Sequence, residues 1–297
     1  MQNAAINETR LKMISKNLIR ALCITLFNGL LLSGTAGQSV AGTFLNSCYD
    51  LPGVKPPDNK PQKGLYVFID QTMALTPMMK QAVIDLVSQW GANGERVKIS
   101  RFSANISGQY SELVFDEVGN IPPTEPYLFH LRTKHKRQIL ACIEEKKHDF
   151  RIALMDSLTA TLKLTDDKLP KTNLIHSLAE FAEQMVAVDD IEDKTVLLVT
   201  DGLENSDLFS FHKRGQVKLI SPKQSLSKVR SKGLIPSWHK AKVYVMGLGY
   251  ISDEKFYARP KIVKPLKQFW ERYFAEGNAV LKANSIGTPM LLTKSIL

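Results

Sequence analysis

The chain has 297 residues, of which 44% are hydrophobic and 23% are charged, as in an ordinary globular protein. With no low-complexity segment, this composition excludes a disordered chain, and the length allows a sizeable hydrophobic core. A formal net charge of +10 favours acidic partners or anionic surfaces, although part of the excess belongs to the N-terminal segment.

Residues 1–41 have the pattern of a signal peptide. Basic residues precede an apolar core at 21–32, and Ser39-Val40-Ala41 has the small-x-small form of a signal-peptidase site. The apolar run is about 12 residues long, whereas a membrane-spanning helix needs about 20. We therefore expect a periplasmic or secreted protein, with an N-terminal membrane anchor as the alternative. Met1 and Met13 are both candidate start sites.

Two cysteines remain once this segment is set aside. Cys23 lies in the apolar run, so Cys48 and Cys142 form an even pair in an oxidising compartment. A disulfide between them would tie the start of the mature chain to its middle. The alternative is that Cys142, which lies in an apolar helical pattern, is a buried thiol.

Beyond a Pro-rich stretch at 42–63, which predicts a tether, apolar strands alternate with amphipathic helices. Strands are predicted at 65–69, 96–103, 112–115, 194–200, 242–246 and 280–286, and helices at 77–90, 174–185 and 266–274. This alternation predicts an α/β fold with a doubly wound, mostly parallel, Rossmann-like sheet covered on both faces. We expect one domain over 64–297, with helical insertions at about 122–170 and 203–240. The helices of 122–170 are expected to be interrupted by charged residues.

Two of the strongest predicted strands end in an aspartate, Asp70 and Asp201. Ligands of open parallel sheets bind at the carboxyl ends of the strands, so these side chains are candidate site residues. Thr72 follows Asp70 by two residues, Thr172 precedes the helix at 174–185, and Asp201 lies in a Thr-Asp-Gly loop. Aspartate also commonly caps a following helix, which is the alternative role for both carboxylates.

With these loops, residues 64–286 resemble the von Willebrand factor type A family. The metal-ion-dependent adhesion site of that family combines an Asp-x-Ser-x-Ser loop, a distant Thr and a Thr-Asp-Gly loop. The matching positions are Asp70, Thr72, Ala74, Thr172 and Asp201. The resemblance implies that the two threonines ligate Mg²⁺, that the two aspartates hold its waters, and that a partner's carboxylate completes the shell.

The match is incomplete, because Ala74 stands where the family has its second serine. One oxygen ligand is therefore missing. Two interpretations stay open: a site that still binds Mg²⁺, and a retained fold whose metal site has decayed. Glu204 and Asn205 follow the third loop and are interpreted as rim residues or as ordinary polar surface residues.

Three hypotheses about function follow. The favoured one is an exported, non-enzymatic domain for adhesion or scaffolding, which binds an acidic side chain of a protein partner and needs no small-molecule cofactor. The second is a metal-free structural subunit of an envelope secretion, conjugation or surface-fibre assembly. Its basic insertions would dock the partners, and would also suit nucleic acid or an anionic surface. The third is an Asp70-dependent phosphohydrolase, but Thr72 stands where the haloacid dehalogenase family has its second aspartate.

Overall fold

The computed structural model describes residues 48–57, 60–102, 111–164, 173–213, 216–251, 256–287 and 296. The predicted signal peptide and Thr172 therefore lie outside the described residues. The chain divides into two units, Met1–Ala41 and Gly42–Leu297, and the second contains every described element. Among the described residues, no helix combines the length and the apolar character needed to cross a membrane.

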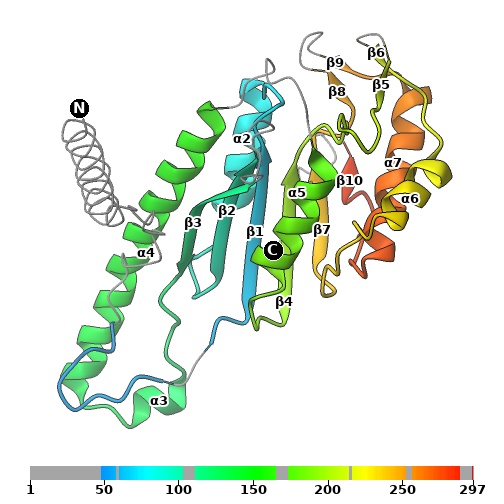
Figure 1. Ribbon diagram of the computed structural model, residues 1–297. Helices are drawn as coiled ribbons and strands as arrows, with labels where there is room; N and C mark the ends of the chain where they lie inside the picture. The colour runs from blue at the N-terminus through cyan, green and yellow to red at the C-terminus, as the bar shows by residue number, and fades with distance from the viewer. Residues whose placement is uncertain are drawn as a thin grey trace, which may run out of the picture. The chain divides into compact units, whose positions relative to one another are not determined.

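A six-stranded sheet lies at the centre of the second unit, in the order β10-β7-β4-β1-β2-β3 (Figure 1). Its strands are β1 (Lys63–Asp70), β2 (Arg96–Phe102), β3 (Ser111–Val118), β4 (Asp193–Val199), β7 (Lys242–Met246) and β10 (Ile286–Gly287). Neighbouring strands are parallel except β2 and β3, which form an antiparallel pair at one edge. The predicted, mostly parallel Rossmann-like α/β sheet is confirmed.

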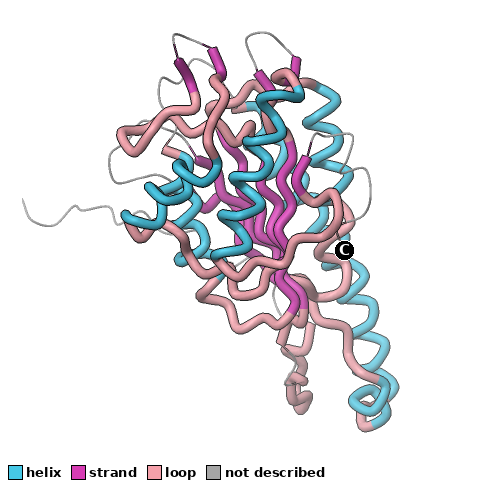
Figure 2. The backbone as a smooth tube through the Cα atoms, turned by 90° about the vertical axis from the view of Figure 1, so that its right-hand side faces the viewer, coloured by secondary structure: helices cyan, strands magenta, loops and turns pink. Residues whose placement is uncertain are grey.

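Helices lie on both sides of this sheet (Figure 2). One face packs against α2 (Pro77–Val87) and the second half of α4 (Thr133–Lys163). The other face packs against α5 (Leu174–Phe181) with its π-helical extension η1 (Ala182–Val186), α6 (Pro222–Ser231) and α7 (Pro260–Glu276). The remaining short elements are α3 (Glu125–Phe129) and the hairpins β5 (His212–Lys213) with β6 (Gln216–Val217) and β8 (Tyr250–Ile251) with β9 (Phe256–Tyr257).

Strand β1 shows why the sequence of a central strand is apolar throughout. Leu65, Val67 and Ile69 pack in the α2–α4 layer, whereas Tyr66 and Phe68 pack in the α5–α7 layer. Successive side chains of a strand point to opposite faces, and both faces of this sheet are covered. Every one of these five side chains is fully buried.

Helix α4 differs from the expected interrupted helices, because it is one continuous helix of 31 residues. Its charged residues lie mostly on an exposed face and do not break it. The second half, from Phe150 to Leu162, packs in the core, so the segment 122–170 contains a core helix as well as an insertion. The first half extends beyond the sheet (Figure 1).

The first half of α4 packs against residues 48–57. Ile139 and Ile143 pack against Cys48 and Tyr49, and a disulfide joins Cys48 to Cys142 with a Cα–Cα distance of 5.7 Å. Residues 48–57, expected to belong to a tether, are thus held against the helix. We call residues 48–57, α3 and residues 133–145 together the stapled arm.

The last predicted strand is shorter than expected. Val280 forms a single bridge with Lys242, and regular pairing resumes only at Ile286. Asn284 adopts a left-handed conformation between them, with φ of 62°. A turn therefore interrupts the strand, since a residue in this conformation cannot continue an extended ladder.

Candidate functional site

Asp70 and Asp201 lie at the same edge of the sheet. Asp70 is the last residue of β1, and Asp201 follows β4 by two residues. Ile69 pairs with Val199 in the parallel register of these two strands, so both loops leave the sheet at neighbouring points. This edge, formed by the carboxyl ends of adjacent parallel strands, is where open α/β sheets bind their ligands.

Three hydrogen bonds orient the Asp70 carboxylate, which is fully buried. Thr72 donates both its backbone N–H, at 2.9 Å, and its hydroxyl, at 2.6 Å, to Oδ1. Thr200 donates its hydroxyl to Oδ2 at 2.7 Å. Burial raises the pKa of Asp70, and these donors only partly offset the rise.

The Asp201 carboxylate is held by its own loop. Its Oδ1 accepts a hydrogen bond from the Leu203 N–H at 2.8 Å. Burial, and then the charge of Asp70, raise the pKa of Asp201. Two like charges in a poorly hydrated place are unfavourable until a proton or a cation neutralises them. The pair is therefore arranged to attract a positive charge.

Gly202 makes the turn between these groups and the core. Its φ is +69°, and an added Cβ would lie 2.5 Å from Leu248 Cδ1 and 2.7 Å from Trp270 Nε1. The Trp270 indole donates a hydrogen bond to the Gly202 carbonyl at 3.0 Å. Only glycine fits both the backbone conformation and the space, so the Thr-Asp-Gly loop is locked onto α7.

Glu204 is a buried residue of this region, not the rim residue that the sequence suggested. Its side chain is 0% exposed, and its Oε2 accepts a hydrogen bond from the Ile175 N–H at 2.9 Å. Its Oε1 has no hydrogen-bond partner among the described residues. Burial raises the pKa of Glu204 to about 7.

The contact of Glu204 joins two of the three predicted loops. Asn173, the residue before α5, makes no side-chain capping bond, so Glu204 satisfies the first turn of that helix from the loop after β4. Only Asn173 separates the first turn of α5 from Thr172 in the sequence. No local sequence signal reveals this contact, because the two residues that form it are 29 positions apart.

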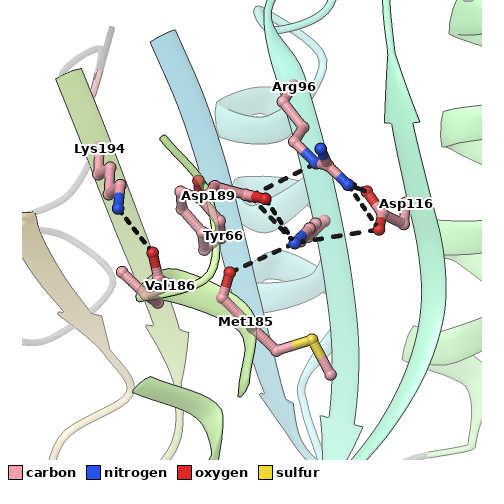
Figure 3. Close-up of polar contacts among 8 residues, drawn as sticks. Tyr66, Arg96, Asp116, Met185, Val186, Asp189 and Lys194 are labelled. Carbon is pink, nitrogen blue, oxygen red and sulfur yellow. Dashed lines mark hydrogen bonds and ion pairs between the residues drawn. The ribbon is translucent and has the colours of Figure 1, made fainter. Parts of the chain in front are cut away.

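Two lysines near the beginnings of β2 and β4 bind carbonyls at the other end of the same helix (Figure 3). Lys194 donates from Nζ to the Val186 carbonyl at 2.7 Å, and Lys98 donates to the Met185 carbonyl at 3.4 Å. Cations stabilise the exposed carbonyls at a helix C-terminus. The α5–η1 helix is thus held at both ends, by Glu204 at its beginning and by the two lysines at its end.

A buried ionic cluster surrounds Lys98. Its ammonium lies 3.0 Å from Asp189, and the two side chains are only 5% and 8% exposed. Asp189 also accepts the Tyr66 hydroxyl at 2.8 Å, and Arg96 forms two hydrogen bonds with Asp116 at 2.8 and 2.9 Å (Figure 3). Burial raises the pKa of Tyr66, so its hydroxyl stays protonated and donates. This cluster ties η1, β1, β2 and β3 together.

The oxygens at the carboxyl edge fit a hard divalent cation. Asp70 and Asp201 supply carboxylates, and Thr72 and Thr200 supply hydroxyls, which are the ligand types that Mg²⁺ prefers beside its waters. Within the described part of the chain, no group of three or more His, Cys, Asp or Glu is placed to hold a metal. A metal here would thus depend on two carboxylates combined with hydroxyls and water. Ala74 lies in the same loop and adds no side-chain oxygen.

Comparisons with known proteins return low similarity throughout. No family model and no curated protein matches the sequence. Among solved structures, the pilus adhesin SpaC from Lactobacillus rhamnosus GG is 11% identical over 80% of this chain, with a TM-score of 0.41. An aerotolerance-related membrane protein from Bacteroides fragilis NCTC 9343 is 14% identical over 76% of this chain and 92% of its own, with a TM-score of 0.29.

BatB from Bacteroides thetaiotaomicron is 15% identical over the same shares of the two chains, with a TM-score of 0.31. The chain spans 29% of the length of the SpaC adhesin that it matches. These identities and scores carry no argument about function. Membership of the von Willebrand factor type A family therefore stays a prediction from the loop motifs.

Proposed function

We propose that the protein is an exported, non-enzymatic binding domain that holds Mg²⁺ at the carboxyl edge of its sheet and recognises a partner protein there. The observation that carries this proposal is the pair Asp70 and Asp201. Two carboxylates lie at the ends of adjacent strands, and the charge of one raises the pKa of the other. A divalent cation removes that electrostatic conflict.

The residues of the chain have separate roles in this proposal. Asp70 and Asp201 attract the ion and orient its waters, and the Thr72 hydroxyl ligates it directly. Thr172 has the same role as Thr72 in the family pattern. Bound Mg²⁺ supplies a Lewis-acidic position that an acidic side chain of the partner protein completes. No small-molecule cofactor enters the proposal.

Binding is preferred to hydrolysis because of how Asp70 is held. Both of its oxygens accept hydroxyl protons, from Thr72 and Thr200, and the side chain is fully buried. A nucleophilic carboxylate needs one oxygen directed at the substrate. The arrangement of Asp70 therefore supports a structural role beside a metal rather than attack on a phosphoester.

Export is part of the proposal. It rests on the signal-like residues 1–41 and on the Cys48–Cys142 disulfide, because disulfides persist in oxidising compartments. Fractionation of the host cells, with N-terminal sequencing of the purified protein, tests it. A protein recovered in the cytoplasm with residues 1–41 intact contradicts export.

Calorimetry of the purified protein with MgCl₂ and MnCl₂ tests the metal site. We expect binding heat from the native protein and its loss in Asp70→Asn. Asp85→Asn is the matched control, because Asp85 is an exposed carboxylate on α2, and it should bind like the native protein. No heat from the native protein, or equal heat from Asp70→Asn, contradicts the metal site.

Two observations favour a second candidate, a metal-free scaffold subunit of an envelope assembly. Ala74 removes a ligand, and the Asp70 oxygens are already satisfied by hydroxyls and an amide of the protein. This candidate predicts partner capture that survives EDTA and weakens steeply with salt, because exposed charges are screened. Capture from an envelope extract on immobilised protein, compared in EDTA and in high salt, separates the two candidates.

A further inference from the structure

The end of the stapled arm carries a group of basic residues without carboxylate partners. This basic tip consists of Arg132, Lys134, Lys136 and Arg137. Among the residues that the structure describes, none of the four forms an ion pair. Arg132, Lys134 and Arg137 are exposed, and Lys136 is half-buried.

The rest of the same helix is arranged differently. Lys146 pairs with Asp149 at 3.0 Å, and Lys147 pairs with Glu144 at 2.7 Å. The charge of α4 is thus balanced along its middle and unbalanced at its beginning. The unpaired positive charge is therefore confined to the beginning of one continuous helix.

The position of the basic tip at a helix beginning increases its positive potential. The first turn of α4 has no acidic residue, and Arg132 at the N-cap makes no side-chain capping bond. The N-terminus of a helix carries a partial positive charge, so cations there are unfavourable for the isolated protein. An anionic surface placed against the tip offsets this repulsion between the cations and the helix N-terminus.

An exposed aromatic side chain accompanies these cations. Phe129, the last residue of α3, is 86% exposed, the highest exposure of any large hydrophobic residue in the described part of the chain. Leu140, on the exposed side of α4, is 40% exposed. Aromatic and aliphatic side chains beside lysine and arginine are typical of surfaces that enter the headgroup region of a bilayer. A duplex nucleic acid would use the charges but offers Phe129 no apolar phase, whereas a bilayer accommodates both the cations and the ring.

The arm is built to hold this tip rigidly. Besides the disulfide, Tyr49 donates its hydroxyl to the Ile121 carbonyl at 2.6 Å, and Tyr127 donates to the Lys55 carbonyl at 2.7 Å. The two tyrosine rings meet edge to face with centroids 5.8 Å apart. A bilayer-contacting surface on such a support binds without the entropic cost of ordering a flexible loop.

The tip and the carboxyl edge lie at opposite ends of the domain. The arm extends past the end of the sheet where β1 begins, whereas Asp70 lies where β1 ends (Figure 1). Contact of the tip with a membrane therefore leaves the carboxyl edge exposed.

We propose that the basic tip, together with Phe129, docks on the surface of an anionic lipid bilayer. The domain then presents its carboxyl edge away from the membrane, towards a partner. This inference is independent of the metal site, because no residue of the tip contributes to the carboxyl edge.

Vesicle co-sedimentation of the purified protein tests the proposal. The probes are vesicles of phosphatidylcholine mixed with phosphatidylglycerol and vesicles of phosphatidylcholine alone. We expect binding to the anionic vesicles only, weakening as salt is raised. A triple variant, Arg132→Gln, Lys134→Gln and Arg137→Gln, should lose at least about tenfold in affinity, because each cation near such a surface contributes several-fold. Phe129→Ser should weaken binding while keeping its salt dependence.

A matched variant removes the same charge from the middle of the helix: Lys146→Gln, Lys147→Gln and Arg151→Gln. This variant should sediment with the vesicles like the native protein. Thermal melts of both triple variants check that they fold. Equal binding to both kinds of vesicle, or an equal loss in the two triple variants, overturns the proposal. So does displacement from the vesicles by equimolar duplex DNA or polyglutamate, which would assign the tip to a different polyanion.

Discussion

Thr200 donates a hydrogen bond to Asp70 at 2.7 Å, although the two residues are 130 positions apart in the chain. The bond joins the end of β4 to the end of β1. The same Thr200 oxygen also accepts the Gly202 N–H at 3.1 Å, so one hydroxyl orients both halves of the site. Thr200 was not among the predicted ligands, yet it is the residue that makes the two loops one unit.

Restoring the missing hydroxyl should strengthen metal binding. Ala74→Ser adds an oxygen at the position where the adhesion-site pattern has its second serine. We expect about a tenfold gain in Mg²⁺ or Mn²⁺ affinity, since a hard cation gains a direct oxygen ligand in place of a water. Calorimetry measures the gain, and the same substitution combined with Asp70→Asn should show none. An unchanged affinity would place residue 74 outside the coordination sphere.

Glu204 should make the protein less stable as the pH rises. Its pKa is about 7 in the folded protein, above the ordinary value of 4.5, so the folded state favours the protonated form. Its contribution is fully present below about pH 4.5 and is lost as the pH rises through 7, a total of about 3 kcal/mol. Urea unfolding at a series of pH values measures this slope.

Glu204→Gln is the comparison for that slope. Glutamine keeps an oxygen acceptor for the Ile175 N–H but does not ionise. The variant should therefore gain stability relative to the native protein above pH 7 and show a flatter pH dependence. Asp70 and Asp201 are present in both proteins, so the difference between the two curves reports Glu204 together with its electrostatic coupling to Asp70. Parallel curves would show that this carboxyl does not titrate in that range.

Removing Asp189 should destabilise the fold strongly. Asp189→Ala leaves Lys98 almost fully buried, with Asp116 at 4.0 Å as its remaining carboxylate. Breaking a buried ion pair on one side costs roughly 3 kcal/mol. Urea unfolding monitored by circular dichroism measures the loss. Asp190→Ala is the control, because Asp190 follows Asp189 in the sequence but its side chain is 96% exposed and pairs only with Lys60 at the surface. The unfolding midpoint of this variant should not move.

Opening the disulfide should destabilise the stapled arm. The bridge closes a loop with a sequence separation of 94 residues, and its loss should lower the unfolding free energy by about 3 kcal/mol. Unfolding with and without reductant measures this, and the double variant Cys48→Ser, Cys142→Ser should not respond to reductant. Limited proteolysis should cut residues 48–57 faster in the reduced protein. Identical curves for reduced and oxidised protein would contradict a stabilising role.

The sequence alone was sufficient for the sheet and for three of the site's residues. The apolar runs of β1 and β4 predicted buried parallel strands, and Asp70 and Asp201 were recognisable because each follows such a run. Thr72 was recognisable by its fixed spacing from Asp70, and the structure shows that spacing as two hydrogen bonds. Patterns of this kind are local, so they can be recognised without knowledge of the fold.

Local patterns misjudged α4 because its charges were read along the chain and not around the helix. Several charged residues follow one another between Glu144 and Arg151, yet Phe150 among them is buried in the core. From Phe150 onward, a buried residue in each turn is enough to keep the helix on the sheet. Only the packed structure distinguishes a continuous helix with one apolar stripe from helices interrupted by charged residues.

What the sequence determined by itself is the order of strands and helices and the two carboxylates at the strand ends, because these depend on periodicity and spacing between near neighbours. The tertiary structure alone decided the roles of Thr200 and Glu204, the support of α5 by Lys98 and Lys194, and the presentation of the basic tip. Most of these contacts join elements that are distant along the chain. Their partners are chosen by packing, and packing leaves no periodic trace in the sequence.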